Sequence, residues 1–331
     1  MTTATAYPFS AGVVIPVCTP LTPQNEIDAL SLRRHLDHLI DSGVDGVFVL
    51  GTSGEFGFLT DRQRADVVRE AVDHVDGRVP VLVGVSDTSS ERAAEQVRML
   101  MHLGGRGADG AVATAPFFAA TGQLEIAAHF RRIKQELGNL PLFGYENPSR
   151  VNGTSIPVGT VLELAADGTF AGFKDSSGDL AYLKAILAGR RERGLDGFLV
   201  LSGSETAAAA ALRLGADGLV PGLGNVDPAG YVRLQAAAGV DDVTCDAEQQ
   251  RLKELFAIVS IPTHLPMGGS SQALGAFKAA MRLLGLIDDD RCAPPSVLFD
   301  DDDRAQVAAL VRAHGPAPAH VSATARRSVT S

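Results

Sequence analysis

The segment SGVDGVFVLGTSGEFGFLTDRQRADVVREAVDHVDGRVPVLVGVS, residues 42–86, decides the fold. It holds two apolar runs, GVFVL (46–50) and VPVLVGV (79–85), on either side of an amphipathic stretch at 61–75. Neither run alternates regularly between apolar and polar residues, which is typical of strands buried on both faces. The stretch between them has the period of a helix. The segment therefore predicts a strand–helix–strand unit of a parallel sheet.

The same unit recurs along the chain at even spacing. The apolar runs expected to form strands are VVIPV (13–17), GVFVL (46–50), VPVLVGV (79–85), DGAVATA (109–115), LPLFGY (140–145), FAGFK (170–174), FLVLSG (198–203) and DGLVP (217–221). We expect helices to begin at the capping residues Asp28, Thr60 and Ser89. They are expected to end at Gly43, Gly77 and Gly104. A doubly wound sheet is the alternative, but eight even units favour an α/β fold closed as a TIM (β/α)8 barrel.

After residue 240 the strand pattern stops. We expect residues 1–240 to form the barrel and residues 241–313 to form a C-terminal three-helix extension. The helices are predicted at 246–259, 271–286 and 302–313. Residues 314–331 are rich in Ala, Ser, Thr and Pro, which predicts a disordered tail.

The composition excludes several classes of function. The 331 residues carry 29 basic and 39 acidic side chains, a net charge of −10, which argues against nucleic-acid and anionic-membrane partners. No apolar run approaches the roughly 20 residues of a membrane-spanning helix. Cys18, Cys245 and Cys292 lie too far apart for a CxxC knuckle or a disulfide framework. We expect a cytoplasmic protein.

Lys174 is the first candidate catalytic residue. In a barrel of this kind the active site is formed by the carboxyl ends of the strands, and Lys174 ends the run FAGFK. Burial disfavours the charged form of an amine, and a neutral amine can add to a ketone to form a Schiff base. The alternative is a lysine held in an ion pair with Asp175 or Glu205.

The motif YENPSR (145–150) supplies two more candidates. Tyr145 alone among the four tyrosines ends a predicted barrel strand, where a phenol could relay protons. The alternative is a packing residue with a hydrogen-bonded hydroxyl. Arg150 could bind a substrate carboxylate through its planar guanidinium group, or it could be solvated.

The GTSGE loop (51–55) is expected to hold a carboxylate. Thr52 and Ser53 supply adjacent hydroxyls, and Gly51 leaves backbone N–H groups accessible. The alternative is an ordinary helix entry with Glu55 in the first turn.

Metal chemistry is disfavoured by the positions of the histidines, none of which lies at a predicted strand end. The aspartates at 288–290 and 300–303 are expected to be solvated loop residues and helix caps. The glycines of PGLGN (221–225) have no basic residue nearby, so they are weak evidence for a phosphate site.

Taken in order, these motifs resemble the dihydrodipicolinate synthase/N-acetylneuraminate lyase family of pyruvate-handling class I aldolases. The resemblance covers about residues 10–313 and rests on IPVCTPLT (15–22), SGVDGVFVLGTSGE (42–55), YENPSR (145–150), GFKDSSGD (172–179), LSGSE (201–205) and GLVPGLGNV (218–226). It implies a (β/α)8 barrel with a C-terminal helical domain and usually a homotetramer. It also implies a covalent lysine Schiff base with substrate and no metal or organic cofactor.

The resemblance implies roles for individual residues. Lys174 would form the Schiff base, and Tyr145 would relay protons with Thr52. The residues that would contact the bound keto acid are Thr52, Ser53, Gly203 and Val220.

Four differences from the patterns of this family bear on the substrate. Ser53 stands where synthases usually carry a second threonine. Phe118, expected beside the substrate, stands where synthases usually carry a tyrosine contributed across a dimer interface. Its missing hydroxyl argues against dihydrodipicolinate synthase itself. Glu146 stands where Asn is common. Arg150 matches the arginine that helps synthases bind their second substrate, and its presence departs from the usual neuraminate-lyase pattern.

We therefore expect a class I lyase that acts on a small 2-keto acid by cleavage or dehydration. The preferred reaction is pyruvate-releasing cleavage of a 2-keto-3-deoxy sugar acid. One alternative is 4-hydroxy-tetrahydrodipicolinate (dihydrodipicolinate) synthase, which condenses pyruvate with aspartate semialdehyde. Another is a catalytically silent barrel that binds a 2-oxo acid.

Overall fold

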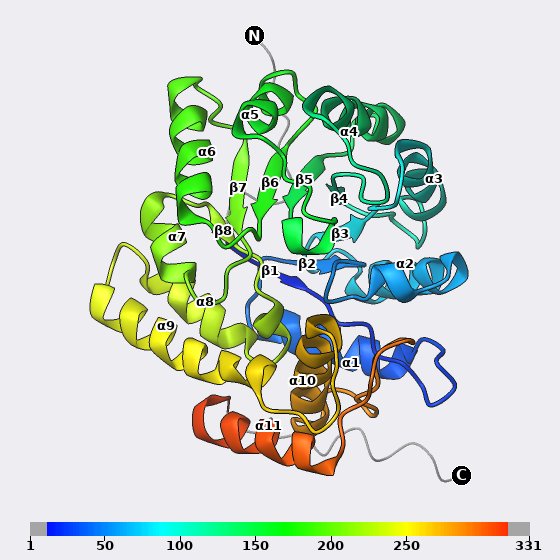
Figure 1. Cartoon of the computed structure of the whole chain (residues 1–331), viewed down its shortest axis with the longest axis vertical. Coiled ribbons are helices and arrows are strands. Elements are labelled where there is room, and N and C mark those ends of the chain that lie inside the picture. Colours follow the sequence, from blue (N-terminus) through cyan, green and yellow to red (C-terminus); the bar gives the residue numbers. More distant parts are fainter. Residues whose placement is uncertain (1–11, 317–331) are drawn as a thin grey trace.

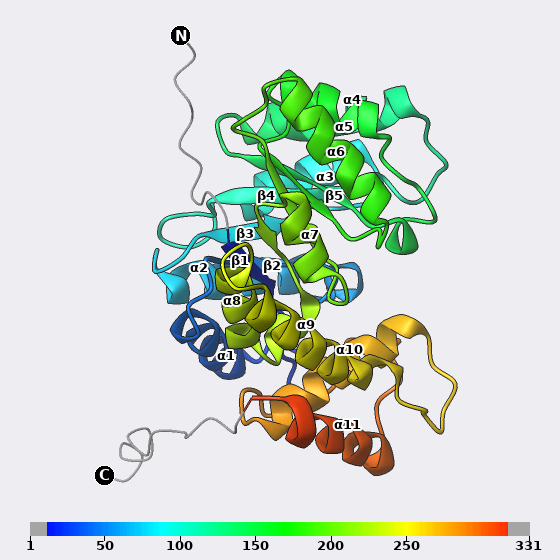
Figure 2. The same cartoon turned by 90° about the vertical axis from the view of Figure 1, so that its left-hand side faces the viewer.

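The computed structural model describes residues 12–316, and their centre is a closed barrel of parallel strands (Figures 1 and 2). Consecutive strands pair in chain order, and β8 pairs with β1 to close the barrel. The strands are β1 (Gly12–Pro16), β2 (Gly46–Val49), β3 (Val81–Gly84), β4 (Gly110–Thr114), β5 (Leu142–Glu146), β6 (Gly172–Asp175), β7 (Leu199–Ser202) and β8 (Gly218–Leu219). The predicted (β/α)8 barrel is confirmed.

A helix follows each strand and covers the outside of the barrel (Figure 1). The helices are α1 (Ala29–Asp41), α2 (Asp61–Val75), α3 (Ser90–Leu100), α4 (Gln123–Leu137), α5 (Val158–Ala166), α6 (Leu180–Glu192), α7 (Ala208–Leu214) and α8 (Pro228–Ala237). Asp28, Thr60 and Ser89 cap α1, α2 and α3 as predicted, each accepting a hydrogen bond from a first-turn N–H group. Across residues 12–316, none of the helices is both long and apolar enough to cross a membrane.

Side chains alternate between the two faces of each strand, so the apolar side chains form two layers: one inside the barrel and one between the strands and the helices. Inward-facing side chains such as Phe48, Phe143 and Leu201 form a cluster inside the barrel. Outward-facing side chains such as Phe173 belong to a second cluster that is shared with the helices. Gly172 makes room for the inner layer, because a Cβ at this position would lie 2.4 Å from the Phe143 ring. The floor below the strand ends is therefore solidly packed.

Three further helices form the C-terminal extension: α9 (Asp242–Phe256), α10 (Gly269–Leu283) and α11 (Asp301–His314). They lie together beside the barrel, with α9 packed on α8 and α10 packed on α11 (Figure 2). Each of the three begins earlier than the sequence pattern predicts. The predicted division into two domains at residue 240 falls between α8 and α9. Since these two helices are in direct contact, the division remains a proposal. The predicted disordered tail, 314–331, lies outside the described residues except for 314–316.

The expectation of solvated aspartates is only partly right. Asp300 caps α11 in a capping box with Asp303. Asp290 and Asp303, however, are buried. Asp290 is paired with Arg304 at 2.6 Å and with Arg282 at 3.2 Å, and these two guanidinium groups compensate its burial.

Two buried histidines give the barrel a predicted sensitivity to acid. Burial lowers the pKa of His35 and of His129 to about 4. A histidine in the unfolded chain has a pKa of about 6.5, so between about pH 6.5 and pH 4 the unfolded state binds protons that the folded state does not. The free energy of unfolding is expected to fall as pH is lowered through this window, by up to about 3 kcal/mol per histidine.

Urea unfolding at a series of pH values across this window measures the effect. In a His129→Gln variant the dependence should be shallower than in the wild type. The matched control is His102→Gln, which replaces an exposed histidine and should leave the slope unchanged. Equal slopes in His129→Gln and the wild type would contradict the assignment.

Candidate active site

Lys174 and Tyr145 are neighbours because their strands are in register. Tyr145 on β5 is the pairing partner of Lys174 on β6. Both residues occupy inward-facing positions at the carboxyl ends of their strands. Their side chains therefore share the mouth of the barrel.

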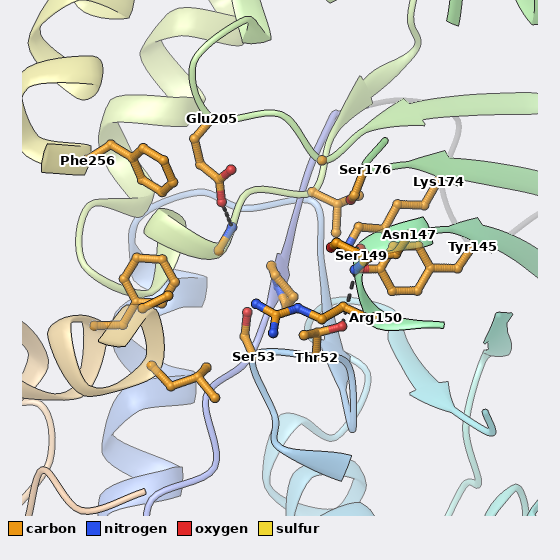
Figure 3. A pocket seen from close by; sticks show the side chains of 17 residues that line it. Thr52, Ser53, Tyr145, Asn147, Ser149, Arg150, Lys174, Ser176, Glu205 and Phe256 are labelled. Carbon is orange, nitrogen blue, oxygen red and sulfur yellow. Dashed lines mark hydrogen bonds between the residues drawn. The ribbon is translucent and has the colours of Figure 1, made fainter. Parts of the chain in front are cut away.

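A cavity of about 220 Å³ opens at this mouth (Figure 3). The predicted site residues that line it are Thr52, Ser53, Tyr145, Arg150, Lys174, Gly203 and Val220. They come from β5, β6 and the four loops that follow β2, β5, β7 and β8 at one end of the barrel. The structure thus brings together seven residues that are far apart in the sequence.

Lys174 is 5% exposed, and its environment is aromatic rather than acidic. Its Nζ lies 4.1 Å from the centre of the Tyr145 ring. The carboxylates proposed as ion-pair partners are engaged elsewhere: Asp175 accepts from the Ser177 N–H at 2.8 Å and Glu205 from the Gly222 N–H at 2.9 Å. In the described part of the chain, Lys174 forms no ion pair with either, so the structural alternative is wrong.

Gly203 keeps the space beside the lysine open. A Cβ at this position would lie 2.0 Å from the Ser176 Oγ and 3.0 Å from the Lys174 Cε. Any larger residue would displace the amine or the hydroxyl. The backbone of this loop therefore forms one wall of the cavity next to Lys174.

The Tyr145 hydroxyl is the centre of a hydrogen-bond network. It lies 3.3 Å from the Thr52 Oγ1 and accepts from the Asn147 Nδ2 at 2.8 Å. Burial opposes ionisation of the phenol, but the charge of Lys174 and hydrogen bonds from Thr52, Ser176 and Asn147 outweigh it and lower the Tyr145 pKa below its ordinary value. The phenol is thus prepared to exchange a proton with a neighbouring group.

The loop that carries Thr52 is a tight turn between two residues with left-handed backbone. Leu50 has φ 58° and Glu55 has φ 60°. The sequence alternative, with Glu55 in the first turn of a helix, is wrong: Glu55 precedes a short 3-10 helix, Phe56–Phe58, without capping it through its side chain, and α2 begins only at Asp61. Glu55 instead turns into the protein and is 1% exposed.

The outer half of the cavity has a different character. Arg150 and Glu205 supply charged groups, and Phe256, Leu274 and Phe277 supply apolar walls. Arg150 donates to the Ser270 Oγ on α10. Burial raises the pKa of Glu205 above its usual range, although backbone N–H groups and Lys174 oppose this shift. This half can therefore contact both polar and apolar parts of a ligand.

Two acidic residues lie immediately behind the catalytic candidates, on the outward face of the same strands. Glu146 and Asp175 are paired in register and are buried, and burial raises the pKa of each. Glu146 accepts from Ser155 Oγ at 2.5 Å and from the Ile156 N–H at 2.9 Å. It therefore ties down the loop that returns from Arg150.

Two predicted contacts with substrate do not line the cavity. Phe118 is 82% exposed, because its side chain points into solvent from the β4–α4 loop of the single chain. Its neighbour Phe117 instead lines a second cavity of about 390 Å³, which lies beyond Thr52 and Arg150. Gly51 is buried at the start of the turn, where a Cβ would lie 2.8 Å from the Phe48 ring.

The one group of three potential metal ligands within residues 12–316 lies outside this site. It comprises His264, Asp300 and Asp303 at the start of α11. Asp300 and Asp303 already form the capping box of that helix, and His264 pairs with Asp300 at 3.2 Å.

Sequence reasoning did not single out several lining residues. Asn147, Ser149 and Ser176 lie two to four residues after Tyr145 or Lys174, in the loops at the strand ends, so the strand-end rule could have found them. Phe256, Leu274 and Phe277 belong to the C-terminal extension. No local pattern indicates that these helices cover the barrel mouth.

A (β/α)8 barrel with a buried lysine and a hydrogen-bonded phenol at its mouth is the arrangement of a lyase of the aldolase type. The chain belongs to the dihydrodipicolinate synthetase family, whose model matches residues 9–314. It is therefore a lyase of that family.

Individual relatives cover most of the chain. A 4-hydroxy-tetrahydrodipicolinate synthase of Methanothermobacter thermautotrophicus is 34% identical over 76% of this chain and 86% of its own. The probable 2-dehydro-3-deoxy-D-pentonate aldolase YjhH of Escherichia coli is 29% identical over 93% and 98%. Among solved structures, YagE of Escherichia coli K12 in complex with pyruvate is 27% identical, with a TM-score of 0.83 over 92% of this chain and 98% of that one.

Proposed function

We propose that the protein cleaves a 2-keto-3-deoxy sugar acid and releases pyruvate through a Schiff base on Lys174. The observation that carries this proposal is the placement of the Lys174 amine 4.1 Å from the Tyr145 ring, with the Tyr145 hydroxyl 3.3 Å from Thr52, in one cavity. The names of YjhH and YagE, an aldolase and a pyruvate-bound relative, support the same class of substrate.

The proposed reaction begins when the Lys174 amine adds to the C2 ketone. The resulting carbinolamine loses water to form an iminium ion, with Tyr145 and Thr52 moving the protons. The C4 hydroxyl then passes its proton to the same Tyr145 relay, the C3–C4 bond breaks and its electron pair enters the enamine, so an aldehyde leaves. Protonation at C3 and hydrolysis return pyruvate and the free amine. Thr52 and Ser53 would hold the carboxylate throughout.

The outer half of the cavity supports a polyhydroxylated leaving group. Glu205 and Ser149 present oxygen atoms, and Arg150 presents N–H donors, to the cavity. Phe118 has no hydroxyl to join a proton relay from a neighbouring chain. Both features favour sugar-acid cleavage over condensation with aspartate semialdehyde.

A comparison of substrates tests the proposal. We expect kcat/KM for cleavage of a 2-keto-3-deoxy pentonate or gluconate to exceed that for condensation of pyruvate with aspartate semialdehyde by about 100-fold or more. Cleavage is followed by pyruvate release with a coupled lactate dehydrogenase. Faster condensation would identify the synthase instead, and turnover of neither, without trapping of pyruvate, would support a silent binding barrel.

We also propose a cytoplasmic homotetramer that needs no metal or organic cofactor. The family resemblance implies this assembly, and the exposed apolar side chains of Phe118 and Leu124, at 82% and 85%, offer a surface that a second copy could cover. Sedimentation of the full chain distinguishes a tetramer from a monomer.

A further inference from the structure

A fully buried ion pair joins the catalytic turn to the C-terminal extension. The Glu55 carboxylate contacts the Lys278 Nζ, and the two residues are 1% and 0% exposed. The second carboxylate oxygen accepts from the Ala293 N–H at 2.5 Å, and the Lys278 Nζ donates to the Arg291 carbonyl at 2.8 Å. The pair is thus fixed at both ends by the loop between α10 and α11.

The charges of this pair are compensated within the pair itself. Burial alone would lower the pKa of the Lys278 ammonium, but Glu55 outweighs burial and raises it. The adjacent thiols do not compete for the charge, because burial raises the pKa of Cys18 and, to about 12, that of Cys292. Replacement of a buried ion pair by apolar groups is often neutral or stabilising, so stability alone does not account for one at this position.

The turn that ends at Glu55 stores backbone strain. Leu50 and Glu55, which bracket it, both have left-handed backbone, and such conformations in non-glycine residues cost about 1–3 kcal/mol each. They persist only where surrounding contacts fix them. On one side, the Thr19 hydroxyl donates to the Gly54 carbonyl at 2.8 Å. On the other, the Glu55 carboxylate is held by Lys278 and by the Ala293 N–H.

Lys278 lies on the helix that also walls the cavity. Ala273, Leu274 and Phe277 of α10 line the cavity that holds Thr52 and Tyr145. The ion pair therefore connects the turn directly to the helix that forms this wall. A shift of the turn would move the Thr52 hydroxyl, which is already at the long end of hydrogen bonding to Tyr145, at 3.3 Å.

We propose that Glu55 and Lys278 are positioning residues: their ion pair holds the turn against α10 so that the Thr52 hydroxyl stays within reach of Tyr145. This inference rests on the proposed function, in which Thr52 and Tyr145 share the proton relay. It means that α10, a helix of the C-terminal extension, supports the proton relay at the barrel mouth.

The test uses pyruvate as the probe, since no aldehyde is then required. Enamine formation exchanges the methyl protons of pyruvate for deuterium in D2O, and NMR follows the exchange. We expect Lys278→Met to lower the exchange rate at saturating pyruvate by about 10- to 100-fold, with a smaller effect on KM, because a displaced hydroxyl no longer assists proton transfer.

A double-mutant cycle separates positioning from general damage. Thr52→Val removes the hydroxyl outright, so adding Lys278→Met to it should cost much less than Lys278→Met costs alone. Arg304→Met is the control: it breaks a partly buried ion pair with Asp290 in the same extension, does not contact the turn, and should leave the exchange rate unchanged. Thermal unfolding reports the stability of every variant.

Glu55→Gln keeps the shape of the side chain and carries the test if Lys278→Met does not fold. A loss of exchange in Glu55→Gln that vanishes in the Thr52→Val background supports the inference. Wild-type exchange in the folded variants, or losses that multiply with that of Thr52→Val, would overturn it. Absence of exchange in the wild-type enzyme would instead refute the proposed function, so the two failures are distinguishable.

Discussion

Lys174→Met is expected to reduce turnover by about four orders of magnitude or more and to abolish covalent capture of pyruvate. The proposed reaction has no other nucleophile, and the thioether cannot add to a ketone. Borohydride reduction in the presence of pyruvate, followed by mass mapping of the peptides, measures capture directly. In the wild-type protein we expect a single modified peptide that contains Lys174.

The control for this experiment is an exposed lysine. Lys184 lies on the outer surface of α6, and Lys184→Met should keep both the label and the activity. Lys174 also packs against the Tyr145 ring, and methionine, which has nearly the same length, can keep this contact and should leave the fold intact. A label on another residue, or activity in Lys174→Met, would refute the Schiff-base mechanism.

Tyr145→Phe is expected to lower kcat by about 100- to 1000-fold with little change in KM. The ring that packs against Lys174 is retained, while the hydroxyl that contacts Thr52 and Asn147 is lost. Proton transfer to and from the carbinolamine is then left to water. Steady-state kinetics and pyruvate deuterium exchange should show similar losses.

The pH profile gives a second readout of the same residue. Because the pKa of Tyr145 is lowered, the phenol loses its proton at a lower pH than a free tyrosine, whose pKa is about 10. If the protonated phenol is required, kcat/KM should fall on the alkaline side below that value, and this limb should disappear in Tyr145→Phe.

Tyr182 provides the matched control. Its hydroxyl donates to the Ile156 carbonyl at 2.6 Å on the outside of the barrel, so Tyr182→Phe removes a partly buried hydrogen bond without touching the cavity. Its rate should be unchanged while its stability falls by about 1 kcal/mol. Equal losses of rate in Tyr145→Phe and Tyr182→Phe would mean that the relay assignment is wrong.

The barrel and the centre of its site could be predicted from local patterns. Each strand is a short apolar run whose end is marked by a polar residue, and parallel pairing brings those ends to one rim. Lys174 and Tyr145 are therefore recognisable without coordinates. The same logic reached Thr52 and Ser53, which directly follow a strand.

The remaining features depend on long-range packing that leaves no local pattern. Glu55 has the sequence context of a helix entry, yet it is buried because Lys278 of a distant helix lies opposite. Phe277 and Leu274 have the period of an ordinary buried helix face. Phe118 lies in a loop whose orientation depends on tertiary contacts, so its exposure was not predictable.

The cavity has two halves of different origin. Strands and the turns directly attached to them supply the residues next to Lys174, whereas Arg150, Phe256 and Leu274 come from a loop and from the extension. Substitutions in the second group of residues could therefore change which aldehyde the protein accepts. The residues next to Lys174, which break the carbon–carbon bond, would stay the same. A combinatorial library that aims at a new substrate should accordingly randomise positions 150, 256 and 274. It should retain Lys278 of α10, which pairs with Glu55 of the turn that carries Thr52.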